Sequence, residues 1–97
     1  MIPDIDSIFA DIYAEKIRQD KRFGGPVHDD NQGVYFFIQS IQDFAGWARQ
    51  MAAQGRSEDA RESLIQVAAL AVAAVESEDR KQQREKTLTA FKASPAA

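Results

Sequence analysis

The sequence predicts an all-α protein, and three segments carry that prediction. Apolar residues recur every three or four positions over residues 5–17 and again over 34–52, and residues 64–75 are rich in alanine, the strongest helix former. These segments predict three helices, over residues 3–21, 33–54 and 57–92. With 97 residues, 44% apolar and 28% charged, the chain has room for one core. We therefore expect a single domain over residues 1–92 and a frayed tail over 93–97.

The first helix is amphipathic, and its beginning is well signalled. Pro3 suits a first helical position, and Asp4 and Asp6 favour the positive end of the helix dipole. The run Phe23-Gly24-Gly25-Pro26 is expected to end it, so residues 23–33 are predicted as a loop. The apolar stripe consists of Ile5, Ile8, Phe9, Ile12, Tyr13 and Ile17.

The second helix is predicted to follow Asp29 and Asp30, which are good capping residues, and to end near Gly55. Phe36 and Trp47 fall off its main apolar stripe. A second apolar strip on one helix indicates another packing surface, so we expect both residues at an interface.

The third helix includes Leu64–Val75, where only Gln66 interrupts the apolar residues. A strand is the alternative, but five alanines and the uninterrupted continuation into Glu76 favour a helix. Because such a helix is apolar on all sides, we expect the chain to form a homodimer or tetramer, with Ala71 and Ala74 at the contact.

Composition excludes several classes of protein. The net charge of −3 argues against nucleic acid as a partner, although residues 77–97 hold five basic side chains against three acidic, a local +2. Without cysteine, and with His28 as the only histidine, thiolate and histidine-rich metal sites are excluded. The acidic amino terminus and the lack of a long apolar run predict a cytoplasmic protein without membrane contact.

One stretch is distinctive: Arg18-Gln19-Asp20, followed by Gly24-Gly25-Pro26-Val27-His28-Asp29-Asp30. Together with Phe37-Ile38 and the run from Leu64 to Ser77, it resembles phage and prophage proteins of the MazG-like all-α nucleotide pyrophosphohydrolase superfamily, over residues 8–81. This resemblance implies a three-helix MazG-like unit that self-associates into a helical bundle. Active relatives hydrolyse nucleoside triphosphates to the monophosphate and pyrophosphate.

In those relatives, Mg²⁺ is held by a Glu-x-x-Glu pair on one helix and a Glu-x-x-Asp pair on the next. Here the first window reads Gln39-Ser40-Ile41-Gln42-Asp43, so only Asp43 is anionic. Asp59 and Glu62 have the second spacing in swapped order, and their simpler role is to stabilise the first turn of a helix. The resemblance thus makes Asp43, Asp59 and Glu62 the candidate catalytic and metal-binding residues.

A ligand site is predicted where the first two helices join. Arg18 and Arg22 lie one turn apart beside Gly24 and Gly25, where guanidinium groups and backbone N–H groups favour a phosphate. Ion pairs with Glu15 and Asp20 are the alternative role of these arginines. The predicted loop also contains His28, Asp29 and Asp30. Either His28 is a general base oriented by the two carboxylates, or these residues contact a ligand or a metal ion. The alternative is that they are turn and capping residues.

Two functions are compatible with these residues. The preferred one is a small, non-catalytic, phage-type protein of the host cytoplasm that binds a nucleotide or a host protein, for example as an inhibitor of host defence. The alternative is an Mg²⁺-dependent nucleoside triphosphate pyrophosphohydrolase that completes its site with Asp29, Asp30 or a second subunit. Trp47, Phe36 and Tyr35 either stack a base or belong to the core or an interface.

Overall fold

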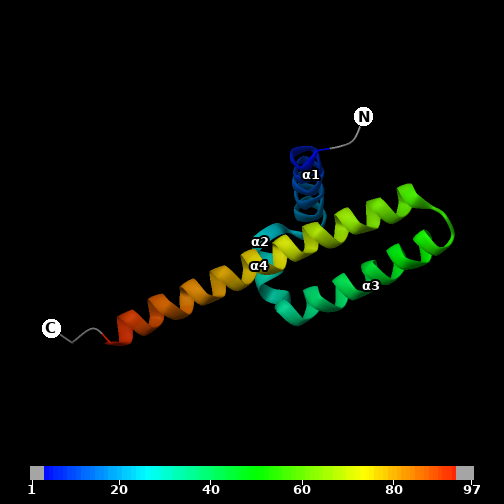
Figure 1. Cartoon of the computed structure of the whole chain (residues 1–97). Coiled ribbons are helices and arrows are strands. Elements are labelled where there is room, and N and C mark those ends of the chain that lie inside the picture. The colour runs from blue at the N-terminus through cyan, green and yellow to red at the C-terminus, as the bar shows by residue number, and fades with distance from the viewer. Residues whose placement is uncertain (1–3, 94–97) are drawn as a thin grey trace.

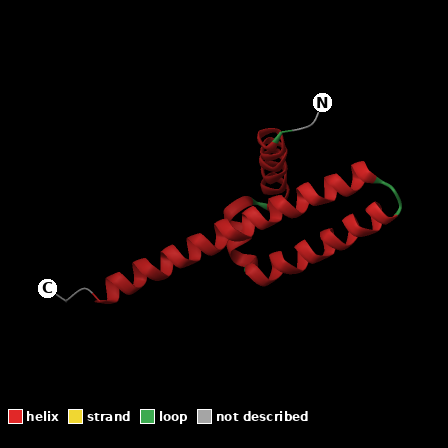
Figure 2. Ribbon diagram, viewed as in Figure 1, coloured by secondary structure: helices red, strands yellow, loops and turns green. Residues whose placement is uncertain are grey.

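The computed structural model describes residues 4–93, which form four helices. These are α1 (Ile5–Phe23), α2 (Gly25–Gln32), α3 (Val34–Ala53) and α4 (Ser57–Ala93). No strand occurs in this part of the chain, so the all-α prediction is confirmed (Figure 2). Helices α3 and α4 form an antiparallel hairpin, α1 stands across α4, and α4 continues beyond the other helices (Figure 1). The molecule therefore measures 66 × 27 × 20 Å.

The prediction of a loop over residues 23–33 is wrong, because Gly25–Gln32 is a helix, and residues 4–93 form four helices instead of three. Gly24 and Gly25 have φ angles of 105° and 68°, so the chain reverses in the left-handed region that glycine tolerates. Pro26 then occupies the first turn of α2, where its missing N–H costs no hydrogen bond. The proline therefore starts a helix as well as preventing the continuation of α1.

Both ends of α1 have local hydrogen bonds that explain their position. Asp4 Oδ1 accepts the Ser7 N–H at 2.8 Å, which makes Asp4 the capping residue, and the helix begins at Ile5. The predicted start at Pro3 lies outside the described residues. At the other end, the Gly24 N–H donates to the Asp20 carbonyl at 2.9 Å, and α1 reaches Phe23, two residues beyond its predicted end.

The turn between α3 and α4 fixes the hairpin. Gly55 has φ 74°, its N–H donates to Ala52 O at 3.1 Å, and the Arg56 N–H donates to Met51 O at 2.8 Å. This pair of bonds is a Schellman motif, which needs a residue at positive φ. Ser57 is the first residue of α4, and the Ala60 N–H donates to Arg56 O at 3.0 Å.

The core is small and lies where α3 meets the middle of α4. Phe37, 2% exposed, packs with Ala73 and Ala74, and the half-buried Leu70 covers them. Ala69 is fully buried. Alanines on this face let neighbouring helices approach α4 closely, since a methyl group adds little to the distance between axes.

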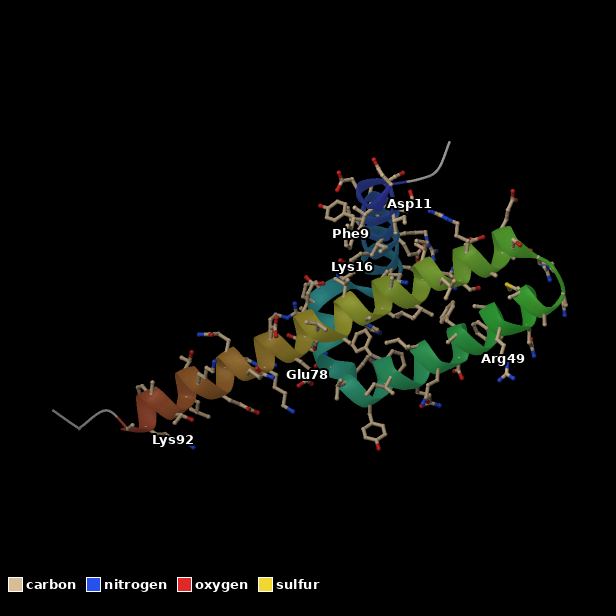
Figure 3. All side chains as sticks on the ribbon, in the orientation of Figure 1. Phe9, Asp11, Lys16, Arg49, Glu78 and Lys92 are labelled. Carbon is tan, nitrogen blue, oxygen red and sulfur yellow. The ribbon has the colours of Figure 1, made fainter. Side chains whose placement is uncertain are left out.

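Helix α4 is not buried on every side within one chain. Leu64, Val72 and Val75 are 56%, 43% and 59% exposed. The amino-terminal half of α1 also projects past α4, and its Phe9 and Tyr13 are exposed (Figures 1 and 3). Large apolar side chains are therefore left uncovered on two adjoining helices.

Ion pairs fix α1 against α4. Arg61 Nη2 lies 2.7 Å from Asp11 Oδ2, and Lys16 Nζ lies 3.1 Å from Glu76 Oε1. Figure 3 shows Asp11 and Phe9 on different sides of α1, so the helix presents one side to Arg61 and leaves an apolar side open.

The carboxyl-terminal part of α4 extends to Ala93. Residues 94–97, most of the predicted frayed tail, lie outside the described part of the chain. Over residues 4–93, none of the helices carries an apolar stretch long enough to span a bilayer.

Candidate functional site

A cavity of about 290 Å³ lies where the carboxyl-terminal half of α1, α2 and the first half of α3 meet α4. Arg18 and Arg22 stand at its edge on α1, and His28 and Asp29 enter it from α2. The structure thus brings together four of the seven residues predicted to bind a ligand. This volume is at the lower end of the range for small-molecule pockets.

Aromatic rings form one wall of the cavity. The rings of Phe23 and His28 are stacked, with centroids 5.8 Å apart and an interplanar angle of 26°. His28 meets Phe36 edge-on at 6.3 Å, and Phe36 meets Phe37 edge-on at 5.9 Å. These rings give a planar ligand several apolar faces and edges to contact. Phe44 also lines the cavity, and it packs against Trp47.

Asp29 is buried in this wall, with 7% of its surface exposed. One of its oxygens, Oδ1, lies 3.4 Å from Nδ1 of His28, which is a long hydrogen bond. A carboxylate accepts up to about four hydrogen bonds, so this group retains free acceptor capacity toward the cavity.

Arg18 and Arg22 make different contacts. Arg18 forms a two-point ion pair with Glu15, with its Nε 2.8 Å from Oε1 and its Nη2 2.7 Å from Oε2. The guanidinium of Arg22 lies 5.3 Å from the centroid of the Phe23 ring, a cation–π contact. The predicted ion pair with Glu15 is therefore confirmed for Arg18, and Arg22 is placed to offer its charge to a ligand.

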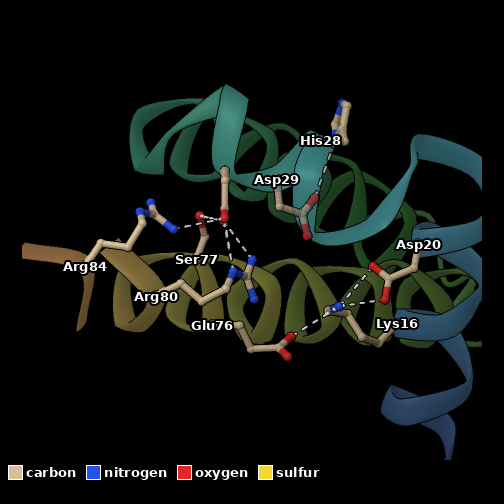
Figure 4. A network of polar contacts seen from close by, with 9 residues as sticks. Lys16, Asp20, His28, Asp29, Glu76, Ser77, Arg80 and Arg84 are labelled. Atoms are coloured by element: carbon tan, nitrogen blue, oxygen red, sulfur yellow. Dashed lines mark hydrogen bonds and ion pairs between the residues drawn. The ribbon is translucent and has the colours of Figure 1, made fainter. Parts of the chain in front are cut away.

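Asp30 does not belong to the cavity, contrary to the ligand role predicted for it. Its Oδ1 accepts hydrogen bonds from Arg80 Nη2 at 2.8 Å and from Ser77 Oγ at 2.9 Å, and its Oδ2 lies 3.2 Å from Arg84 Nη1. Figure 4 shows this arginine clamp between α2 and α4, apart from His28 and Asp29. The hydrogen bonds from Arg80 lower the pKa of Asp30 to about 2, helped by Ser77 and Arg84.

Gly24 and Gly25 were predicted to offer backbone donors to an anion. The Gly24 N–H is used by the Asp20 carbonyl, and Gly25 is buried. Neither glycine lines the cavity. The turn thus serves to place α2 beside the end of α1, which brings His28 close to Phe23.

Polar side chains that were not predicted as site residues complete the cavity. Gln19 is 8% exposed and its Nε2 donates to the Gln66 carbonyl at 3.5 Å, a weak bond between α1 and α4. Ser40 and Asp20 line the cavity as well, and Asp20 is held by Lys16 at 2.9 Å. Burial opposes the charge on Lys16, but hydrogen bonds to Asp20 and Glu76 outweigh it and raise the pKa of the lysine. Gln66 also lines the cavity, and the sequence could have indicated it, since it is the one polar residue in the apolar run over residues 64–75.

The predicted metal ligands do not assemble within one chain. Asp43 and Glu62 are exposed, and Asp59 is paired with Arg56 at 2.7 Å. Met51 Sδ contacts Ser63 Oγ across the hairpin, so Asp43 lies roughly 13–18 Å along the helices from the level of Glu62 and Asp59, at 1.5 Å per residue. Between residues 4 and 93, no group of three or more acidic or histidine side chains is arranged to hold a metal ion. The candidate residues therefore do not fit Mg²⁺ in a single chain.

The predicted interface residues fall in different environments. Trp47 is 49% exposed and Phe36 43% exposed. Ala74 is buried in the core against Phe37, so α3 of the same chain covers it, whereas Ala71 is half-buried.

Searches against protein-family models, curated proteins and solved structures give no match for this chain. The likeness to MazG-like proteins accordingly remains a prediction from sequence, and the shown fold is an all-helical one.

Proposed function

We propose that the chain is a non-catalytic, MazG-like binding protein of phage type that holds a nucleotide in the cavity between α1, α2, α3 and α4. One observation carries the proposal. A single cavity combines arginines at its edge, an aromatic wall and buried polar groups. Phosphate, a planar base and the polar edge of that base are complementary to these three kinds of group.

The arginines supply the anion-binding part of the proposal. A charge-assisted hydrogen bond contributes about 1.5–3 kcal/mol, and guanidinium groups bind phosphate through two parallel bonds. Arg22 is expected to contribute more than Arg18, because the charge of Arg18 is already neutralised by Glu15 at 2.7 Å.

The non-catalytic part of the proposal rests on the residues of α3. Gln39, Ser40 and Gln42 stand where the resemblance requires paired carboxylates, and neutral amides and a hydroxyl are weak ligands for a hard dication. Asp59, the best remaining candidate, is engaged by Arg56.

Isothermal titration calorimetry tests nucleotide binding directly. Nucleoside mono- and triphosphates are titrated into the parent protein in the presence of a chelator. Arg22→Ala should weaken binding by roughly 10- to 150-fold, the equivalent of one charge-assisted contact, and Arg18→Ala by less. Arg49→Ala, an exposed arginine of α3 outside the cavity, is the matched control and should bind like the parent (Figure 3). Absence of heat from every nucleotide refutes the proposal.

The enzymatic alternative has its own test. The parent protein is incubated with ribo- and deoxyribonucleoside triphosphates and Mg²⁺ or Mn²⁺, and pyrophosphate is measured. We expect no release above buffer. Turnover that disappears in Asp59→Asn or Glu62→Gln would establish the pyrophosphohydrolase and replace the binding function.

A host protein is the second candidate ligand, and the exposed aromatic strip of α3 favours it. Trp47 is 49% exposed and Phe36 43% exposed. Aromatic side chains of this kind are enriched among the residues that dominate protein–protein binding. If no nucleotide binds, this strip is the surface on which a partner, such as a component of host defence, is expected.

We also propose that the chain self-associates. Large apolar side chains are exposed on two helices that contact each other: Leu64, Val72 and Val75 on α4, and Phe9 and Tyr13 on α1. Phe37 is the one large apolar side chain buried among residues 4–93, so the core of a single chain is small. Covering the exposed side chains in a homodimer adds the burial that the monomer lacks.

A further inference from the structure

Among residues 4–93, Asp29 is the one acidic residue that is buried. It is 7% exposed, and within residues 4–93 its carboxylate has one hydrogen-bonding contact, with His28 Nδ1 at 3.4 Å. The neighbouring Asp30 is held by Arg80, Ser77 and Arg84. Among the described residues no buried side-chain oxygen lacks a partner, so the unbonded oxygen of Asp29 is still reached by water, and a donor on a ligand in the cavity can replace that water.

The position of Asp29 favours contact with the base of a nucleotide rather than with its phosphate. It lies on α2 next to His28, whose ring stacks on Phe23 and meets the edge of Phe36. The arginines that line the cavity come from α1, and Arg22 lies against the Phe23 ring. A negative carboxylate repels phosphate, whereas the rings beside it favour a planar heteroaromatic group.

The chemistry of the four bases then decides which of them fits. An ionised carboxylate only accepts hydrogen bonds. Adenine, cytosine and guanine each present an exocyclic amino group that donates, and pairing of an acidic side chain with the cytosine amino group is a known mode of readout. Uracil and thymine instead present carbonyl oxygens on both sides of their N3–H, and these oxygens repel the carboxylate.

We propose that the Asp29 carboxylate accepts a hydrogen bond from the amino group of the base, so that the cavity selects amino-bearing bases over uracil and thymine. This inference rests on the proposed nucleotide-binding function. It adds the class of base and the residue that distinguishes it.

Two pairs of nucleotides test how the amino group of the base affects binding to the parent protein. CMP has an amino group where UMP has an oxygen, and UMP in addition carries a proton on the neighbouring ring nitrogen; AMP and IMP differ in the same way. Calorimetry without metal should give CMP and AMP affinities roughly 10-fold or more above those of UMP and IMP, the size expected for one hydrogen bond to a charged acceptor.

Asp29→Asn then assigns the preference to this side chain. The amide has nearly the same shape but also donates, so it accommodates an oxygen as well as an amino group. The CMP-to-UMP ratio should fall to within about 3-fold or reverse. Asp79→Asn, at an exposed carboxylate on α4 outside the cavity, is the matched control and should keep the parent ratio. Far-ultraviolet circular dichroism verifies that each variant is folded.

A failure of base selection by Asp29 gives a different result from a failure of nucleotide binding. If all four nucleotides bind with equal affinity, or UMP binds more tightly than CMP, base selection by Asp29 is refuted and nucleotide binding stands. If Asp29→Asn keeps the parent ratio while folded, another group reads the base and the inference is wrong. If none of the nucleotides binds, the proposed function fails and the inference fails with it.

Discussion

Arg80 holds Asp30 through two of its nitrogens, with Nη2 2.8 Å and Nε 3.0 Å from the same carboxylate oxygen, Oδ1. The two residues are 50 positions apart, so the contact fixes α2 on α4. Because His28 and Asp29 precede Asp30 on α2, the same contact sets where they enter the cavity. The clamp is therefore a structural support of the candidate site rather than part of its lining.

Replacing Asp30 by asparagine should destabilise the protein at neutral pH and alter its response to acid. The pKa of Asp30 is about 2 in the folded protein, below the value of about 3.9 in an unfolded chain. A lowered pKa stabilises the fold at pH values above about 4, and this stabilisation is lost as the pH falls from about 4 to about 2. Thermal unfolding of Asp30→Asn should therefore approach that of the parent over this interval. Asp79→Asn, an exposed carboxylate, should follow the parent at every pH.

Gly55→Ala should destabilise the hairpin of α3 and α4 by about 1–2 kcal/mol. Gly55 has φ 74°, where a Cβ is strained even though nothing lies within 4 Å of it. Gly46 lies inside α3, also with open space around it, so Gly46→Ala should stabilise the protein by up to about 1 kcal/mol through helix propensity. Urea denaturation of the two variants measures the contrast. Equal effects of the two substitutions would contradict the turn geometry.

Phe37→Ala should cost about 3–5 kcal/mol, because the side chain is 2% exposed and packs on Ala73 and Ala74. Tyr35→Ala removes a ring of similar size that is 86% exposed, and its effect should stay within about 0.5 kcal/mol. Chemical denaturation followed by circular dichroism gives both values. A small effect at Phe37 would mean that the core lies elsewhere.

Val75→Glu should dissociate the proposed oligomer without unfolding the chain. Val75 is 59% exposed in the single chain, so a glutamate is tolerated there in the monomer but leaves a buried, unpaired charge in an interface. Ala71→Glu, at a half-buried position on α4, tests the predicted contact residue in the same way. Gln50→Glu on the exposed side of α3 is the control. Light scattering of the parent at micromolar concentration should give at least a dimer, and a stable monomer would refute self-association.

The local part of the fold follows from the sequence. The spacing of apolar residues, the acids at the start of α1 and the glycines that follow α1 and α3 act within a few residues, so they place α1, α3 and α4 to within about two residues at the described ends. Helix α2 was not predicted from the sequence, because Gly24-Gly25-Pro26 has two opposite effects on helix formation. It ends one helix, and it also contains the proline that favours the first turn of the next.

The sequence by itself also predicted Arg18, Arg22, His28 and Asp29 as ligand-binding residues, since charged and turn-forming residues concentrate in this stretch. It could not separate Asp29 from Asp30, which are adjacent and chemically identical. Successive residues on a helix point about 100° apart, so one carboxylate faces the cavity and the other faces α4. Only the packing of α2 against Arg80, 50 residues away, decides which of them is neutralised and which remains free to accept a hydrogen bond.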